Sequence, residues 1–201
     1  MQKLLTGLID SIFPPTDNEQ LLRLTTPDAF VTLAQFGNHH GSDYLTHYTD
    51  KLVRTAVTEN KFNHHPTAAK LLGALLKNWS DTQPDTTLYI PIPLGPKRQR
   101  ERGHNQAETV LRQARVKNIN TTLLKRAVET KQQTTLHKSE RQKNMQNVFA
   151  YTNQNIDWTS FTQVIIFDDV VTTGATLLAA RATLAPHLPP HLKLRCLAIA
   201  H

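Results

Sequence analysis

Cysteine is almost absent from this 201-residue chain, in which Cys196 stands alone. A single thiol excludes an internal disulfide and a four-cysteine zinc site. Within the segment LKLRCLAIA it is predicted to be a small buried core residue, because no neighbouring residue would activate it. This scarcity of cysteine favours a cytoplasmic location.

Long hydrophobic runs are also missing. No uninterrupted apolar stretch approaches the roughly 18 residues that a membrane-spanning helix needs. The opening residues, MQKLLTGLIDSIFPP, contain a Lys and an Asp and lack a small-residue cleavage site, so no signal peptide is predicted. Because 39% of the residues are hydrophobic, wholesale disorder is not expected either. We expect one soluble domain, or one domain with a small appendage.

Acidic residues are the scarcer of the two charge classes, with 16 Asp and Glu against 23 Lys and Arg. The basic excess is confined to residues 97–144, which hold 13 Lys and Arg and four Asp and Glu. A concentrated positive charge of this kind favours an anionic partner, either a small polyphosphate or a nucleic acid.

Strand and helix patterns alternate along the second half of the chain. The predicted strands span residues 88–94, 119–128, 162–169 and 192–200, and the predicted helices span residues 103–116 and 175–188. The first strand ends at Pro91 and Pro93, because proline cannot donate to a central ladder. The alternation predicts an α/β fold with a mostly parallel sheet flanked by helices. Ligands bind such sheets at the carboxyl ends of the strands.

The preceding residues, 1–80, are predicted to form an N-terminal helical segment, a hood or partner-binding surface, ahead of a domain over residues 81–201. Apolar residues recur at helical spacing in residues 48–62 and 66–79. Residues 1–45 favour two short helices, or a helix and a loop, because a proline interrupts any single helix. The polar stretch SDTQPDTT marks the boundary.

The stretch VIIFDDVVTTGAT, residues 164–176, indicates specific chemistry. A buried strand delivers two carboxylates, Asp168 and Asp169, into a Thr-rich loop that opens a helix. Gly174 lets the backbone approach a ligand closely, and the N–H groups of the first helical turn favour an anion. The carboxylates suit hydroxyls and a cation, so we predict a site for a ribose 5-phosphate.

The predicted ligand-binding loop consists of Val170, Val171, Thr172, Thr173, Gly174, Ala175 and Thr176. An acidic strand end that caps the next helix, or the acidic pocket of a receiver domain, would also account for the carboxylates. Neither alternative accounts for the Thr-Thr-Gly-Ala-Thr sequence that follows them.

This segment resembles the phosphoribosyl pyrophosphate (PRPP) signature of type I phosphoribosyltransferases: an apolar strand, two acidic residues, two apolar residues and Thr-Thr-Gly-x-Thr. Two further stretches are similar to the ComF/GntX family, the competence protein F family. Residues 89–108 resemble its Pro-x-Pro-Leu strand end and its Arg-Gly-aromatic-Asn-Gln-Ala segment, and residues 123–151 resemble its Gln…Leu…Glu-Arg…Asn…Phe segment. A fainter likeness includes Tyr48, Lys61 and Phe62.

The resemblance implies a type I phosphoribosyltransferase-like fold that binds PRPP with Mg²⁺. It makes Asp168 and Asp169 catalytic, with Mg²⁺ held by them directly or through the ligand. It also implies a role in natural competence, with single-stranded DNA and proteins of the DNA-uptake machinery as partners. The family commonly begins with a four-cysteine zinc ribbon, but residues 1–45 contain no cysteine and the histidines lack a regular ligand spacing, so zinc is not predicted.

The predicted contacts to pyrophosphate or nucleic acid are Pro93, Leu94, Arg98, Arg100, Arg102 and Arg141. Arginine forks bind phosphate oxygens in bidentate fashion, although a run of charge is equally typical of a solvated surface. Residues 129–147 are predicted to form a long polar loop. This loop suits plain solvent surface, a lid over the ligand or a track for nucleic-acid phosphates.

Two functions from different classes remain open. One is enzymatic, the Mg²⁺-dependent transfer of a phosphoribosyl group from PRPP to an acceptor. The other is a non-catalytic role, in which the ribose-phosphate pocket acts as a sensor or anchor during the uptake or use of external DNA. No acceptor-binding segment is recognisable in the sequence.

Overall fold

The computed structural model describes residues 16–127 and 148–201. Its centre is a six-stranded sheet in the order β1-β2-β8-β7-β3-β4, in which every neighbouring pair is parallel except β1 and β2. The strands are β1 (Gly37–His39), β2 (Ser42–Thr46), β3 (Thr87–Pro91), β4 (Asn118–Ile119), β7 (Gln163–Val170) and β8 (Lys193–Ala200). The predicted α/β fold with a mostly parallel sheet is confirmed.

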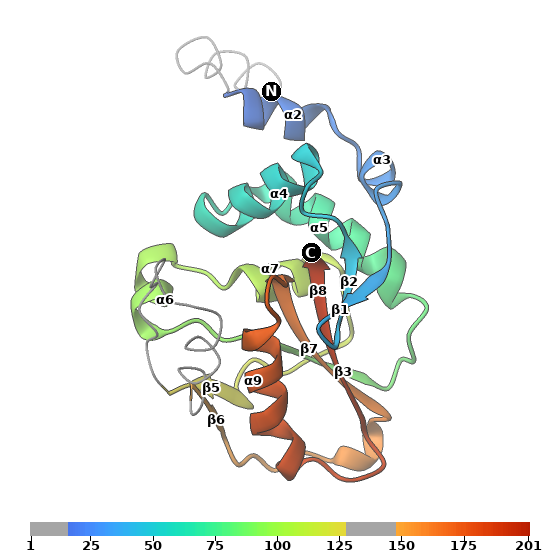
Figure 1. Ribbon diagram of the computed structural model, residues 1–201, viewed down its shortest axis with the longest axis vertical. Helices are drawn as coiled ribbons and strands as arrows, with labels where there is room; N and C mark the ends of the chain where they lie inside the picture. Colours follow the sequence, from blue (N-terminus) through green and yellow to red (C-terminus); the bar gives the residue numbers. More distant parts are fainter. Residues whose placement is uncertain (1–15, 128–147) are drawn as a thin grey trace, which may run out of the picture.

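Helices cover both faces of this sheet (Figure 1). The helices of the described residues are α2 (Asp17–Leu24), α3 (Pro27–Val31), α4 (Lys51–Phe62), α5 (Pro66–Ser80), α6 (Pro96–Arg102), α7 (Gln106–Gln113) and α9 (Ala175–Leu184). Short 3₁₀ turns lie at Trp158–Ser160 and Ala185–His187. Helices α4, α5 and α7 pack on one face and α9 on the other, so the sheet is sandwiched between two layers (Figure 1).

Strand β7 shows how the sequence produces these layers. Alternate side chains of a strand point to opposite faces, so Ile165 and Phe167 join the core beneath α4, α5 and α7. Val164 and Ile166 join the second core, beneath α9. An apolar run without polar alternation is typical of a parallel strand buried on both sides.

The predicted strand over residues 119–128 is divided in two. Its start belongs to β4, whereas β5 (Leu124–Arg126) pairs antiparallel with β6 (Phe149–Tyr151) in a separate two-stranded sheet. The Asn120 side chain causes the break, because its Oδ1 accepts the backbone N–H groups of Thr122 at 2.9 Å and Leu123 at 2.7 Å. Such an Asx turn ends one ladder and redirects the chain.

The N-terminal helical prediction needs a correction at residues 37–46. These residues form the β1–β2 hairpin, and β2 pairs in parallel with β8 inside the main sheet. The turn places His40 and Gly41 in the left-handed region, at φ values of 49° and 75°. Residues before and after position 80 therefore share one sheet and one hydrophobic core.

Within the described residues, no helix is both long enough and apolar enough to span a membrane. The predicted long loop over residues 129–147 lies outside the described residues.

Candidate functional site

A pocket of about 440 Å³ opens at the carboxyl edge of the sheet. Strands β3 and β7 are adjacent and parallel, so the segments that follow them meet at this edge. The predicted site residues that line the pocket are Pro93, Leu94, Arg98, Arg102, Asp168, Asp169, Val170, Thr172 and Thr176. The structure thus places side chains from three separate sequence segments around one space.

The two carboxylates at the end of β7 are buried. Burial and the neighbouring Asp169 carboxylate raise the pKa of Asp168 well above its ordinary value. The Asp169 backbone N–H donates to Asp168 Oδ1 at 2.9 Å, and the Val170 N–H donates to Asp169 Oδ1 at 3.1 Å. Both Oδ1 atoms are thereby satisfied by backbone.

The second oxygen of Asp169 is different, because Oδ2 is buried and has no hydrogen-bond partner among the described residues. Its neighbour is the ammonium group of Lys61, which lies 3.5 Å away. A buried oxygen atom without a hydrogen bond lowers the stability of the folded protein unless a donor reaches it. Asp169 Oδ2 is therefore suited to receive a hydroxyl group from a ligand in the pocket.

The loop after the carboxylates leads into the N-terminus of α9. Gly174 is the N-cap residue with a φ of 72°, a left-handed conformation that favours glycine, and no side chain caps the helix. The Ala175 N–H donates to Thr173 Oγ1 at 3.5 Å, and the other N–H groups of the first turn, together with the helix dipole, remain available for an anion. Thr172 and Thr176 line the pocket beside them, whereas Val171 is buried in the core beneath α9.

Three arginine side chains among the described residues form another part of the lining, which we call the arginine wall. Arg98 and Arg102 lie one turn apart on α6, and Arg126 lies on β5. Burial, together with the nearby Arg98 charge, lowers the pKa of both Arg102 and Arg126. Cations gathered in a partly buried pocket repel one another, so this wall favours a ligand that carries several negative charges.

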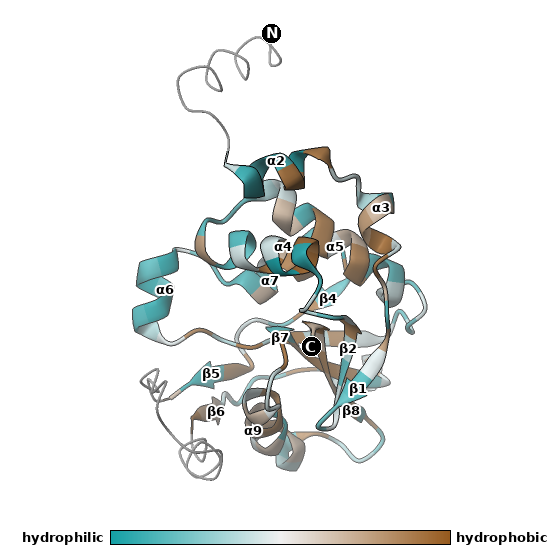
Figure 2. Ribbon diagram, turned by 45° about the horizontal axis from the view of Figure 1, so that its top comes forward, coloured by the Kyte–Doolittle hydropathy of each residue, from teal (hydrophilic) through white to brown (hydrophobic). Residues whose placement is uncertain are grey.

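One predicted contact among the described residues, Arg100, does not line the pocket. Arg100 is exposed and absent from the pocket lining, because its position falls on a different face of α6 from Arg98 and Arg102. Figure 2 shows that α6 is hydrophilic along its whole length, and none of its residues is buried. Arg141 lies outside the described residues.

Among the lining residues that are absent from the predicted site are Tyr48, Lys61, Phe62 and Arg126. The first three follow β2 or belong to α4, and the only signal for them in the sequence is their faint likeness to the ComF/GntX pattern. Arg126 reaches the pocket because the Asx turn at Asn120 redirects β5. The spacing of residues along the chain reveals neither the placement of the first three residues in the pocket nor that of Arg126.

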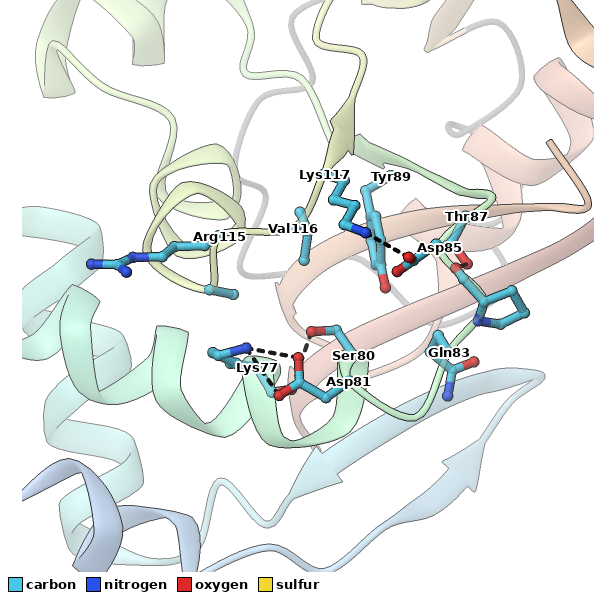
Figure 3. A pocket seen from close by; sticks show the side chains of 12 residues that line it. Lys77, Ser80, Asp81, Gln83, Asp85, Thr87, Tyr89, Arg115, Val116 and Lys117 are labelled. Carbon is cyan, nitrogen blue, oxygen red and sulfur yellow. Dashed lines mark hydrogen bonds and ion pairs between the residues drawn. The ribbon is translucent and has the colours of Figure 1, made fainter. Parts of the chain in front are cut away.

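A second pocket, of about 270 Å³, includes residues at the start of β3, away from the carboxyl ends of the strands (Figure 3). Four of its charged side chains form ion pairs, since Lys77 binds Asp81 at 2.8 Å and Lys117 binds Asp85. Burial raises the pKa of Tyr89 to about 12, so its phenol is neutral. This pocket lacks the three arginines and the buried carboxylate pair that line the larger pocket.

No family model matches the chain. The chain is 30% identical over 144 residues to Competence protein F from Haemophilus influenzae. The matched region covers 66% of this chain and 61% of that protein, so the chain spans about three fifths of the length of this relative.

Proposed function

We propose that this chain is a ComF/GntX family member with a type I phosphoribosyltransferase-like domain that binds PRPP or a related ribose 5-phosphate. We further propose that it acts in the cytoplasm in natural competence, in the uptake or use of external DNA. The likeness to Competence protein F supports the biological context. The observation that carries the ligand is one pocket with a buried acidic pair, an uncapped Gly-Thr helix start and an arginine wall.

Each part of PRPP has a matching group in the pocket. The ribose hydroxyls donate to the buried carboxylates, including the unsatisfied Oδ2 of Asp169. The 5′-phosphate lies at the N-terminus of α9 between Thr172 and Thr176. The pyrophosphate lies against Arg98, Arg102 and Arg126, whose guanidinium groups suit phosphate oxygens.

The donor set fits Mg²⁺ only together with a ligand. Within residues 16–127 and 148–201, no group of three or more His, Cys, Asp or Glu side chains is arranged to hold a metal ion. Mg²⁺ is commonly bound through one or two carboxylates plus substrate oxygens and water, which suits Asp168 and Asp169. When bound with PRPP, the ion would neutralise charge on the pyrophosphate.

A second candidate is catalytic turnover in nucleotide metabolism or salvage. In that reaction the bond from C1 of ribose to the pyrophosphate oxygen breaks and a bond from C1 to the acceptor forms. The observation that favours it is that one pocket holds two buried carboxylates, which stabilise a positively charged ribose, together with cations that stabilise the departing pyrophosphate. Release of pyrophosphate on addition of a panel of bases distinguishes turnover from binding alone.

Single-stranded DNA and proteins of the uptake machinery are the proposed macromolecular partners. The exposed Arg100 faces away from the pocket lining and is available to a phosphate backbone. Binding through such contacts weakens steeply as salt rises. Affinity for single-stranded DNA that is absent at low salt, or independent of salt, would contradict this partner.

Calorimetry with PRPP and Mg²⁺ tests the ligand directly. Wild-type protein is expected to bind, and the double variant Asp168→Asn, Asp169→Asn is expected to lose most of the binding heat. The matched control is Asp81→Asn, Asp85→Asn, which removes the same number of charges from the second pocket and should bind like wild type. Equal heats from wild type and the Asp168, Asp169 variant would refute the site.

A deletion strain assayed for transformation tests the biological role. Wild-type protein is expected to restore transformation, and the Asp168→Asn, Asp169→Asn variant is expected not to restore it. Full rescue by this variant would show that the pocket is dispensable for competence.

A further inference from the structure

Two histidines that are far apart in the sequence stack on each other beside the ligand-binding loop. His39 belongs to β1, and His201 directly follows β8. Their ring centroids lie 3.6 Å apart with an interplanar angle of 21°. His39 Nε2 lies 3.0 Å from the carbonyl oxygen of Thr172, and His201 Nδ1 lies 3.2 Å from the carbonyl oxygen of Val171.

These contacts determine which ring nitrogens carry hydrogen. A carbonyl oxygen can only accept, so His39 donates from Nε2 and His201 donates from Nδ1. The two imidazoles thus hold consecutive carbonyl groups, those of Val171 and Thr172, in one orientation.

The orientation of a carbonyl group also fixes the next N–H group. In a planar trans peptide the C=O and the following N–H point in opposite directions, and the described residues contain no cis peptide. Holding the carbonyls of Val171 and Thr172 toward the histidines therefore turns the N–H groups of Thr172 and Thr173 away from them. Thr172 lines the large pocket, so its N–H group is the one that this arrangement leaves nearest to a ligand there.

The hairpin turn also contacts the same loop at Gly174, two residues beyond Thr172. A Cβ atom built on Gly174 would lie only 3.1 Å from His40 Cβ and 3.4 Å from the His40 carbonyl oxygen. Gly41 packs toward Leu178 on α9, with 3.9 Å between its built Cβ and the Leu178 side chain. The β1–β2 hairpin is thus a direct packing partner of the loop and the first turn of α9.

We propose that His39 and His201 are positioning residues that orient the backbone N–H groups of the loop toward the phosphate of the ligand. This inference rests on the proposed function, since the phosphate is that of PRPP or a related ribose 5-phosphate. Neither histidine needs to touch the ligand. Their role is to keep the donors in place before the phosphate arrives, which lowers the entropic cost of binding.

Paired substitutions separate this role from simple packing. His39→Leu and His201→Leu keep apolar bulk but remove the donor, whereas His39→Gln and His201→Asn place an amide N–H where Nε2 and Nδ1 stood. Each Leu variant is expected to bind PRPP with Mg²⁺ about fivefold to tenfold more weakly, the effect of one hydrogen bond. The Gln and Asn variants should recover affinity to within about twofold of wild type. His191→Leu is the control, because that histidine also lies near a backbone carbonyl, that of Trp158.

Amide hydrogen exchange of Val171, Leu178 and His201, whose N–H groups are hydrogen-bonded to backbone carbonyl groups beside the loop, gives a readout that needs no ligand. The Leu variants should exchange faster at these amides, and the Gln and Asn variants should exchange at the wild-type rate. Unchanged exchange and unchanged affinity in the Leu variants, or failure of the amide variants to recover either quantity, would overturn the positioning role. If wild type does not bind PRPP although exchange responds as expected, the ligand assignment fails and the support of the loop by the histidines stands.

Discussion

At the scale of single residues, Asp168 and Asp169 place two buried carboxylates side by side at the end of an apolar strand. Such a pair lowers the stability of the folded protein, because burial and mutual repulsion both oppose ionisation. Functional sites commonly retain groups of this kind at the expense of stability. A gain in the free energy of unfolding should therefore be measurable when one carboxylate is replaced.

Replacement of Asp168 by asparagine is expected to stabilise the protein at neutral pH. Burial and the Asp169 charge raise the pKa of Asp168 above the ordinary value of 3.8, so the folded state binds this proton more tightly than the unfolded state does. The stability that this proton provides is present below pH 3.8 and is lost as the pH rises through the raised pKa. The asparagine side chain carries no charge and retains an oxygen that can accept the Asp169 N–H. Urea denaturation should show a gain of about 0.5–2 kcal/mol at pH 7 that shrinks towards pH 4. An equal gain at both pH values would mean that ionisation of Asp168 is not the cause.

Lys61 forms an ion pair with Asp169 Oδ2, and Lys61→Met removes its charge while keeping the length of the side chain. Because the Lys61 side chain is about one third exposed, the ion pair is partly screened and the loss of stability should be only about 1 kcal/mol. Affinity for PRPP should fall by roughly tenfold, because the ligand is a polyanion. Lys70→Met, at an exposed position of α5, is the control for removal of one positive charge. Equal affinities for the two variants would exclude a specific role for Lys61.

The residues of the site differ in how far the sequence reveals them. Asp168, Asp169 and the Thr-Gly loop are contiguous, so their chemistry is legible in one stretch of sequence. Lys61 and Arg126 join the pocket from distant elements, and His39 and His201 meet across the length of the chain. Tertiary structure alone creates these combinations.

At the scale of elements, two glycines with nearly identical backbone conformations allow a matched comparison. Gly103 ends α6 at a φ of 71°, and Gly174 begins α9 at 72°. A Cβ atom at Gly103 would meet nothing within 4 Å, whereas one at Gly174 would crowd His40. A substitution at either position would therefore cause backbone strain, but only a side chain at Gly174 would also crowd the ligand-binding loop.

The substitution Gly103→Ala is expected to cost about 1 kcal/mol of stability, through left-handed strain alone, and to leave PRPP affinity near wild type. Gly174→Ala should cost about 1–2 kcal/mol more, because the loop or the hairpin must move apart. That movement displaces the N–H groups at the start of α9, so affinity should also fall. Thermal unfolding and calorimetry on both variants measure the two effects. Equal losses of affinity would contradict a specific role for the Gly174 loop.

The sequence identifies an element where buried apolar residues set its pattern. It does not identify an element whose strand conformation depends on pairing with a distant strand. Strands β7 and β8 are eight-residue segments with buried apolar runs, and the sequence identifies both. The β1–β2 hairpin consists of three and five residues without apolar alternation. Its strand conformation depends on pairing with β8, a contact between residues some 150 positions apart, as in Asp43 with Leu197. Local sequence does not encode that contact.

At the scale of the whole molecule, the sheet unites segments that the sequence assigns to separate units. Strand β2 pairs with β8, and one hydrophobic core combines Leu45 and Leu72 with Phe167 and Leu197. The same arrangement brings Lys61 and Phe62 into the pocket beside the carboxylates of β7. Residues before position 80 thus complete both the core and the candidate site.

A fragment of residues 81–201 is therefore expected not to fold by itself. It would expose the face of the sheet that carries Ile165, Phe167 and Leu197, all of which are buried in the full chain. Each such side chain contributes about 1.5–3 kcal/mol when buried, and a whole domain is stable by only about 5–15 kcal/mol.

Circular dichroism of this fragment should show no cooperative thermal transition, whereas the full chain should unfold cooperatively. Addition of a fragment of residues 1–80 should restore the transition and PRPP binding together, because it returns both the missing core and Lys61. A cooperative transition with PRPP binding in the 81–201 fragment alone would instead establish residues 81–201 as an independent domain.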